Sequence, residues 1–305
     1  MIGIGVDAGG TFIKFVAVGD NCRVLDRAQA HTPATGGEFV GVISERILQW
    51  KRELGGRLCA AMGFAGAVDF ERGVVHKAPN IPCIENLNIA EQVKKRTGIP
   101  CVLDNDANMA AWGAYAYDLK EKYPTVITVT LGTGVGGGLV LDGELFRGAT
   151  GAAAEIGHMN IEPGGRRCPC GGRGCLEAYC GKHGIIARAR SAYAAAGKKI
   201  PDGIDPLWLA EAAESGDKAA LELWRKTGEY LGYGLGNACV LLSPDAIVFT
   251  GGLSGAKKFF MPAVEKVFAD WAMDTAFRHV KLKVSRFPNL GSMGAALYAR
   301  HCCRK

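Results

Sequence analysis

The sequence predicts an α/β protein built from two similar lobes, and two observations carry that prediction. Apolar runs typical of strands alternate with longer segments typical of helices along most of the 305 residues. One pattern also occurs twice, in residues 2–18 and again in residues 126–141. Each copy is an apolar run, a turn of glycine and threonine, and a second apolar run. A chain of this length can form one large domain or two moderate ones, and the repeat favours two.

The first lobe is expected to start at the amino end with the first copy of the pattern. Its helices are predicted where apolar residues recur at helical spacing, and its strands where short apolar runs end at turn residues. In chain order we expect a strand at Ile2–Val6, a turn at Asp7–Thr11, strands at Ile13–Val18, Cys59–Phe64 and Pro100–Leu103, and helices near Phe39–Leu54 and Ala107–Tyr117.

The second lobe is expected to contain the second copy and most of the remaining helices. We expect a strand at Val126–Thr130, a turn at Leu131–Gly138, strands at Leu139–Leu141 and Ala246–Thr250, and largely helical segments at Leu176–Ala195, Pro206–Leu241 and Gly291–Arg300. The predicted small lobe is therefore 1–118 together with the last helix, at about 290–305. The predicted large lobe is 119–289, with a cleft between the lobes.

Bulk properties favour a cytoplasmic protein without nucleic-acid or membrane partners. The net charge of +6 comes from scattered basic doublets and triplets, not from one basic stripe of the kind that binds nucleic acid. The uncharged start, Met1–Val6, does not resemble a signal peptide. The longest weakly charged stretch, Leu231–Phe249, is interrupted by Ser243–Asp245 and predicts a buried helix and strand. Eleven cysteines without a secretory signal indicate reduced thiols.

The two glycine-rich turns are candidates for phosphate binding. In a Rossmann or Walker loop a strand leads into a helix, whereas here each turn leads into a second strand. Consecutive backbone N–H groups in such a tight turn can still surround an anion. One glycine hairpin would be most simply only a hairpin. Two related ones in one chain favour a phosphate-binding function.

A cluster of metal-ligating residues narrows the function further. Cys168, Cys170 and Cys175 follow His158 at a spacing that suits a tetrahedral Cys3His zinc site. Four protein ligands leave no position for water, so we expect a structural zinc. The simpler alternatives are a zinc knuckle or three reduced cysteines without metal. Glu155 and Glu177 flank the cluster and remain available for another role, and the second ring nitrogen of His158 is a candidate to meet a substrate hydroxyl.

Taken together, these segments resemble the ROK family of sugar kinases, which has the actin-like ATPase fold. The resemblance extends over nearly the whole chain in the expected order. It rests on Asp7-Ala-Gly-Gly-Thr11, Asn105-Asp106-Ala-Asn108, Gly132-Thr-Gly-Val-Gly-Gly-Gly138, Glu155-Ile-Gly-His158, the cysteine cluster through Glu177, and Pro244-Asp-Ala-Ile-Val-Phe-Thr-Gly-Gly252.

The resemblance implies transfer of the ATP γ-phosphoryl group to a sugar hydroxyl, with Mg²⁺ and Zn²⁺ as metals. Asp7 would hold Mg²⁺, although it could also be a simple turn residue. Asp106 would be the catalytic base, and its alternative role is helix capping. The implied ATP-binding residues are Asp7, Gly9, Gly10, Thr11, Lys14, Gly132, Thr133, Gly134, Gly251, Gly252 and Ser254. The implied sugar-binding residues are Asn80, Asn105, Asp106, Glu155, His158 and Glu177.

The substrate is predicted to be glucose, with several alternatives left open. Ala154 precedes Glu155 where the family commonly has glycine, a feature shared with the family's N-acetylmannosamine kinases. An N-acetylhexosamine kinase, or a fructokinase or mannokinase, is therefore the alternative. A sugar-sensing transcriptional regulator is more remote, because such regulators begin with a helix-turn-helix domain and here the first hairpin begins at residue 2. The resemblance also implies a homodimer. Cys302 and Cys303 receive no role.

Overall fold

The computed structural model describes residues 1–271, 273–285, 287 and 289–304. Its chain divides into two compact units. The first contains Met1–Pro124, Gly138–Ala153 and Phe287–Lys305, and the second contains Thr125–Gly137 and Ala154–Arg286. The predicted lobe boundaries stay a prediction, and they differ from this division mainly at 138–153.

The first unit is organised by a five-stranded sheet in the order β3-β2-β1-β4-β8. The strands are β1 (Ile2–Ala8), β2 (Phe12–Val18), β3 (Val24–His31), β4 (Leu58–Phe64) and β8 (Cys101–Asn105). Strands β1, β2 and β3 form an antiparallel meander, whereas β1, β4 and β8 run parallel. Because β1, β4 and β8 are parallel, the ends of β1 and β8 lie at the same edge of the sheet, and Asp7 and Asn105 are there.

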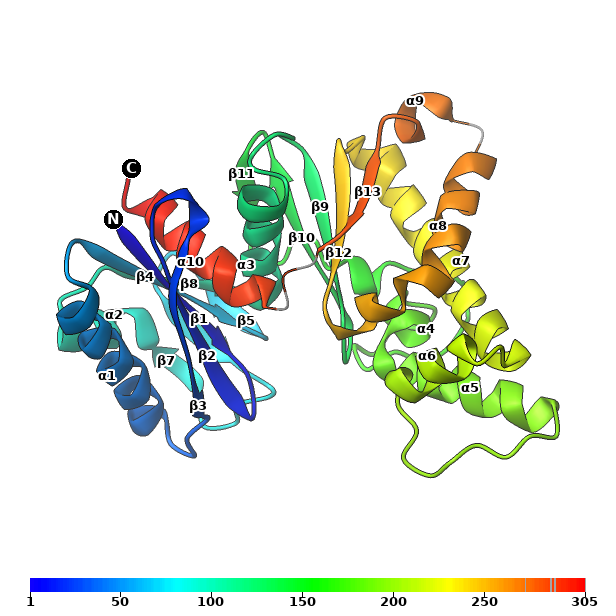
Figure 1. Ribbon diagram of the computed structural model, residues 1–305, viewed down its shortest axis with the longest axis horizontal. Coiled ribbons are helices and arrows are strands. Elements are labelled where there is room, and N and C mark those ends of the chain that lie inside the picture. Colours follow the sequence, from blue (N-terminus) through cyan, green and yellow to red (C-terminus); the bar gives the residue numbers. More distant parts are fainter. Residues whose placement is uncertain (272, 286, 288, 305) are drawn as a thin grey trace. The chain divides into compact units, whose positions relative to one another are not determined.

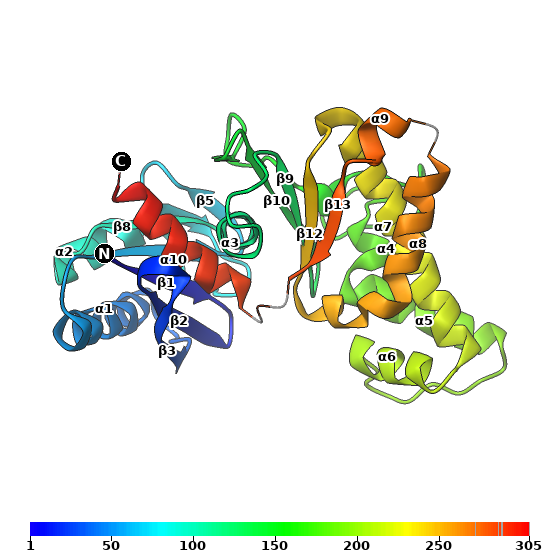
Figure 2. The same cartoon turned by 45° about the horizontal axis from the view of Figure 1, so that its top comes forward.

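Helices cover both faces of this sheet (Figure 1). Helices α1 (Gly36–Leu54) and α2 (Ile89–Thr97) pack on one face, where Ile4 and Val6 join the buried apolar core. Helices α3 (Asp106–Gly113) and α10 (Leu290–Cys302) cover the other face (Figure 2). There β1 carries Gly3 and Gly5, and a side chain at either would collide with the backbone of α10. These glycines let α10 lie directly against the strand.

Several smaller elements of the first unit were not predicted. A three-stranded sheet contains β5 (Ala67–Asp69), β6 (Val74–Lys77) and β7 (Glu85–Asn88), and β11 (Glu144–Phe146) pairs with the end of β10 (Val135–Leu141). The predicted helix at Ala107–Tyr117 is α3 followed by a π-helical turn at Ala114–Asp118. A short 3₁₀ turn occupies Asp20–Cys22.

The second unit contains the parallel strands β9 (Val126–Leu131), β12 (Ala246–Thr250) and β13 (Lys281–Val284), with β12 between the other two. Its helices pack together beside these strands (Figure 1). They are α4 (Glu177–Cys180), α5 (Lys182–Ala195), α6 (Pro206–Glu214), α7 (Lys218–Leu242), α8 (Lys257–Asp270) and α9 (Asp274–Phe277), with 3₁₀ turns at Ile156–His158 and Gly252–Ala256.

The second glycine turn is shorter than predicted. The expected turn covered Leu131–Gly138, but β10 already begins at Val135. Gly137 and Gly138 lie in this strand where neighbouring residues approach it closely. A side chain at Gly137 would meet the carbonyl oxygen of Ala154 at 2.5 Å, and one at Gly138 would meet Ala111 at 2.6 Å.

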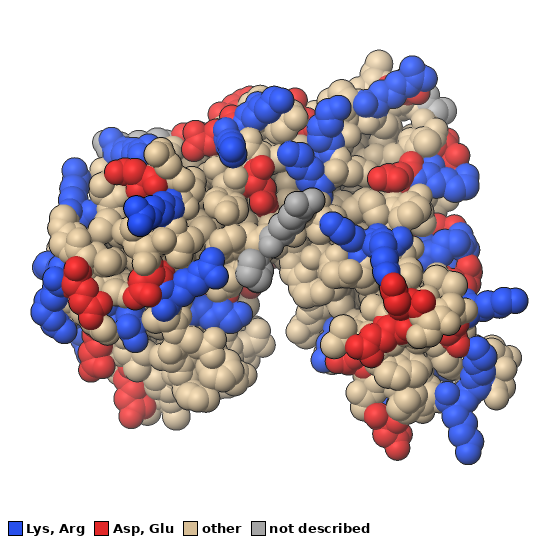
Figure 3. Space-filling model, in the orientation of Figure 1, with Lys and Arg blue, Asp and Glu red and all other residues tan. Residues whose placement is uncertain are grey.

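Charged side chains of both signs are mixed on the surface, in line with the scattered basic residues of the sequence. On the face drawn in Figure 3, basic and acidic side chains are interspersed over each unit. Among the described residues, no helix is both long and apolar enough to cross a membrane.

Candidate functional site

The first glycine turn joins β1 to β2 and is held by backbone contacts. The N–H of Gly9 donates to the carbonyl of Phe12 at 3.1 Å, and the Thr32 hydroxyl donates to the carbonyl of Gly9 at 2.6 Å. Gly10 lies against Asn80, since a side chain there would meet the Asn80 carbonyl oxygen at 2.5 Å. The structure thus brings a predicted sugar-binding residue, Asn80, next to a predicted phosphate-binding turn.

Asp7 lies at the end of β1, where it is paired in register with Lys14 of β2. Burial raises the pKa of the Asp7 carboxyl, and the charge of Lys14 partly offsets this. The carboxyl also faces the first turn of α10, because a side chain at Gly291 would lie 3.7 Å from its Cγ. When ionised, this carboxylate offers oxygen ligands of the kind that divalent cations prefer.

Asn105 and Asp106 form the junction between β8 and α3. The Asn105 side chain caps α3 by accepting a hydrogen bond from the N–H of Ala107 at 2.8 Å. Oδ1 of Asp106 accepts from the same N–H at 3.0 Å. The capping role suggested by the sequence therefore falls mainly to Asn105. The Asp106 carboxyl sits at the positive end of the helix dipole, a position that favours a negative charge.

A buried network next to this junction was missed at the sequence level. Asp104 accepts hydrogen bonds from Arg147 Nε at 2.6 Å, from Asn108 Nδ2 at 2.8 Å and from the N–H of Asn105 at 2.7 Å. Arg147 also donates to the Tyr298 hydroxyl at 2.6 Å. Asp104 lies in a strand that leads directly into a buried helix, and a buried carboxylate needs a cationic partner. That need was the one feature of the sequence that could have indicated the network. Nothing in the sequence pattern identified Arg147 as that partner.

The second glycine turn lies beside Glu177. The N–H of Gly132 donates to the carbonyl of Gly134 at 3.0 Å, which closes the turn. The next N–H, of Val135, donates to Oε2 of Glu177 at 2.9 Å. A side chain at Gly134 would collide with that same carboxylate oxygen. One oxygen of Glu177, a predicted sugar-binding residue, is thus bonded to the first residue of β10, directly after Gly134.

The third glycine segment adjoins the second. Gly251 has a φ of 92°, and a side chain there would collide with the backbone of Leu131, which directly precedes Gly132. Ser254 closes the 3₁₀ turn that follows by donating its hydroxyl to the Gly251 carbonyl at 2.6 Å. Gly252 has open space at its Cβ position. Within the second unit, the predicted adenine-side and phosphate-side glycines are therefore neighbours.

The cysteine cluster has the geometry of a tetrahedral metal site. His158, Cys168, Cys170 and Cys175 place one ligand atom each within 4.8 Å of one another. Zinc bonds of about 2.3 Å to sulfur and about 2.0 Å to nitrogen would separate ligand atoms by about 3.5–3.8 Å in a tetrahedron. The distance from Cys168 Sγ to His158 Nδ1 is 3.7 Å, as is that from Cys170 Sγ to Cys175 Sγ. The residues present therefore fit zinc.

The cluster also positions both flanking glutamates. Nδ1 of His158 faces Cys168, so Nε2 points away from the thiols and lies 3.9 Å from Oε2 of Glu155. Oε1 of Glu177 lies 4.0 Å from Cys168 Sγ. A metal at this position would fix His158 and the segments that carry both carboxylates.

The predicted site residues therefore fall into two groups, one in each unit. The first unit holds Asp7, Gly9, Gly10, Thr11, Lys14, Asn80, Asn105 and Asp106. The second holds Gly132, Thr133, Gly134, Glu155, His158, Cys168, Cys170, Cys175, Glu177, Gly251, Gly252 and Ser254.

Comparison with known proteins assigns the family. The ROK family pattern matches residues 3–301. A glucokinase of Streptomyces coelicolor is 33% identical over 309 residues, with 97% of each chain covered. The crystal structure of a ROK family glucokinase from Streptomyces griseus in complex with glucose and AMPPNP has 32% identity and a TM-score of 0.80, covering 99% of this chain and 100% of that one. A ROK hexokinase from Thermus thermophilus has 29% identity and a TM-score of 0.83, covering 100% and 99%. The chain belongs to the ROK family, has the actin-like ATPase fold, and is an ATP-dependent sugar kinase.

Proposed function

We propose that this sugar kinase is a glucokinase, which transfers the γ-phosphoryl group of ATP to the 6-hydroxyl of glucose. The observation that carries the proposal is the similarity to the Streptomyces griseus glucokinase, whose structure holds glucose and AMPPNP, at 32% identity over 99% of this chain. The Streptomyces coelicolor relative is also named a glucokinase.

Asp106 is the proposed catalytic base, which accepts the proton of the sugar hydroxyl. Its position at the start of α3 places the carboxyl beside the N–H of Ala107. A carboxylate there is a weak base, and a weak base is sufficient because the transition state of phosphoryl transfer depends mainly on alignment and charge neutralisation. Asn105 caps the same helix and so holds the backbone next to Asp106.

The ATP phosphates are proposed to bind at the two glycine turns through their backbone N–H groups. Gly9, Gly10 and Thr11 form the first turn and Gly132, Thr133 and Gly134 the second, while Lys14 adds a cation beside the first. Asp7 would hold Mg²⁺, which neutralises phosphate charge when bound. Gly251, Gly252 and Ser254 are proposed to contact the adenosine side of ATP, because they adjoin the second turn.

The sugar is proposed to contact Asn80, Asn105, Asp106, Glu155, His158 and Glu177. Zinc would not act on the substrate. Held by His158 and the three cysteines, it would fix the loop that carries Glu155 and the start of the helix that carries Glu177. A homodimer, a cytoplasmic location and the absence of nucleic-acid partners remain predictions from the sequence.

A coupled ADP-release assay with MgATP and a panel of sugars tests the proposal. The panel is glucose, mannose, fructose, N-acetylglucosamine and N-acetylmannosamine. We expect the highest kcat/KM on glucose and a loss of about 10²–10⁴-fold in kcat for Asp106→Asn. Asp142→Asn is the matched control, because Asp142 lies in a hairpin turn apart from the proposed site.

The same assay distinguishes the alternatives. Preference for an N-acetylated sugar would replace glucokinase by the N-acetylhexosamine kinase that Ala154 leaves open, and preference for fructose or mannose would indicate a fructokinase or mannokinase. An Asp106→Asn variant as active as the wild type would remove Asp106 from the mechanism. Absence of turnover on every sugar, combined with sugar-dependent binding to a specific DNA sequence, would favour a regulator.

A further inference from the structure

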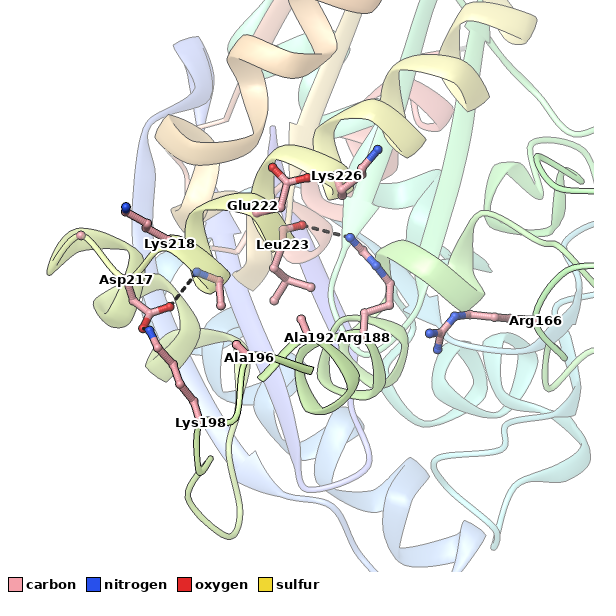
Figure 4. A pocket seen from close by; sticks show the side chains of 12 residues that line it. Arg166, Arg188, Ala192, Ala196, Lys198, Asp217, Lys218, Glu222, Leu223 and Lys226 are labelled. Atoms are coloured by element: carbon pink, nitrogen blue, oxygen red, sulfur yellow. Dashed lines mark hydrogen bonds and ion pairs between the residues drawn. The ribbon is translucent and has the colours of Figure 1, made fainter. Parts of the chain in front are cut away.

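A cavity of about 800 Å³ opens in the second unit between α5 and the first half of α7. Figure 4 shows its lining, with Arg188 extending from α5 toward Leu223 and with Arg166 at one side. None of the lining residues belongs to the proposed ATP, sugar or zinc sites. They are Arg166, Arg188, Ala192, Ala196, Lys198, Gly216, Asp217, Lys218, Ala219, Glu222, Leu223 and Lys226.

The lining combines an apolar floor with cationic walls. Alanines at 192, 196 and 219, together with Leu223, supply the apolar part. Five of the lining side chains are Lys or Arg, whereas two are Asp or Glu. Those two carboxylates already have partners, because Asp217 pairs with Lys198 at 2.6 Å and Glu222 pairs with Arg225 at 2.6 Å. A positive charge therefore remains inside the cavity.

Arg188 is a half-buried cation of this cavity, and its hydrogen-bond partners carry no negative charge. Its guanidinium donates to the carbonyls of Tyr179 and Leu223 at 2.9 and 3.0 Å, and to the Thr227 hydroxyl at 2.9 Å. All three acceptors are neutral, and within the described part of the chain no carboxylate forms an ion pair with Arg188. A guanidinium has five N–H groups, so these three bonds leave two. A half-buried cation held only by neutral groups is costly unless an anion joins it.

Arg166 and Lys218 add to the unpaired charge. Among the residues that the structure describes, neither forms an ion pair with a carboxylate. Burial lowers the pKa of Arg188, while Cys180, Tyr230 and Glu222 act to raise it. The nearby charge of Arg166 acts to lower it, which indicates that the two guanidinium groups repel each other. An anion bound between them would relieve both effects.

We propose that this cavity binds a small phosphorylated molecule that has an apolar body. Guanidinium groups present paired N–H donors that match the oxygens of a phosphate, and two arginines at one cavity suit its double negative charge. The apolar floor accounts for the rest of the ligand, and the volume is within the range of small-molecule sites. The site is independent of the proposed glucokinase activity.

Isothermal titration calorimetry with phenyl phosphate tests the proposal, since this probe combines a phosphate with an apolar ring. We expect one molecule bound per chain, also in the presence of saturating glucose and AMPPNP. Arg188→Gln and Arg166→Gln should each weaken binding, the former by about tenfold, as expected for loss of a hydrogen bond to a charged group. Arg190→Gln is the matched control, because Arg190 is exposed on the same helix and does not line the cavity.

Several results would overturn the inference. These are no binding, equal affinity in both cavity variants and the wild type, or displacement of phenyl phosphate by AMPPNP. If Arg188→Gln does not fold, Arg166→Gln alone tests the proposal, because Arg166 is exposed and its substitution should not affect folding. Benzoate should bind more weakly than phenyl phosphate, and equal or tighter binding of benzoate would contradict the assignment of a phosphate.

Discussion

Nε of Arg147 lies 2.6 Å from Oδ2 of Asp104, and the two side chains are only 14% and 4% exposed. Asp104 directly precedes Asn105 and Asp106, so this ion pair supports the junction that carries the proposed base. Burial lowers the pKa of Arg147, but Asp104 and Tyr298 outweigh burial and raise it, which is consistent with a guanidinium that stays charged.

Arg147→Met should reduce the free energy of unfolding by about 3–5 kcal/mol, because it leaves a buried carboxylate without its cation. Urea unfolding measures the loss. Arg225→Met is the control, since Arg225 also pairs with glutamates but is 45% exposed, and it should cost at most about 1 kcal/mol. Similar small losses in both variants would show that the Arg147 pair does not support the fold.

Asp7→Asn should abolish the kinase activity and yet raise the melting temperature at neutral pH. Burial raises the pKa of Asp7, so the folded state favours the protonated carboxyl. The stability that this group contributes is complete below its usual pKa of 3.8 and is lost as the pH rises through the raised value. Asparagine does not ionise and so avoids this loss. The stability of the variant relative to the wild type should therefore rise as the pH increases.

Thermal melts of both proteins from pH 4 upward, about one unit apart, would measure that difference. It should shrink toward the acidic end and be absent for Asp142→Asn. A constant difference at all pH values would point to a cause other than the ionisation of Asp7.

Gly134→Ala should lower stability, whereas Gly132→Ala should leave it nearly unchanged. The new side chain at residue 134 would collide with Oε2 of Glu177 and break its hydrogen bond to the N–H of Val135. At Gly132 nothing lies within 4 Å of the added atom. Differential scanning calorimetry compares the two, and we expect a loss of about 1–3 kcal/mol for Gly134→Ala alone. Equal melting temperatures for the two variants would show that Glu177 moves aside without cost.

The protein should carry one zinc ion per chain, measurable by elemental mass spectrometry after dialysis. Cys175→Ser should lose the metal and lower the melting temperature, because binding of a structural zinc contributes to folding. Cys83→Ser is the matched control, since Cys83 is half-buried in the first unit and outside the cluster. A wild-type protein that folds normally without any metal would refute the zinc assignment.

Ala154→Gly should stabilise the protein by about 1 kcal/mol, because Ala154 has a φ of 67° in the left-handed region. The strain sits directly before Glu155, at a position where glycine is common in the family. Ala153→Gly is the control, because Ala153 does not have a positive φ, and it should give no such gain in stability. Chemical denaturation measures the free energy of unfolding of both variants. Equal changes in the two would show that the backbone at Ala154 is not strained.

The sequence was most informative where function imposes a local pattern. Both glycine hairpins and the spacing of the cysteines with His158 are readable because each is set by residues close together in the chain, and the ordered motifs identified the family. The Asp104–Arg147 pair was not predictable, because its members lie 43 residues apart and meet only through the folded sheet. The start of β10 was predicted wrongly because Gly137 and Gly138 serve close packing, not a turn.

The glycines at 3 and 5, which lie against α10, also make the first strand of the chain depend on one of its last segments. A ribosome makes β1 long before the residues of α10, so the face of the sheet that α10 covers stays exposed to solvent throughout most of translation. The second unit, by contrast, has all of its residues once Arg286 has been added. The first unit therefore closes with residues that are made after every residue of the second unit.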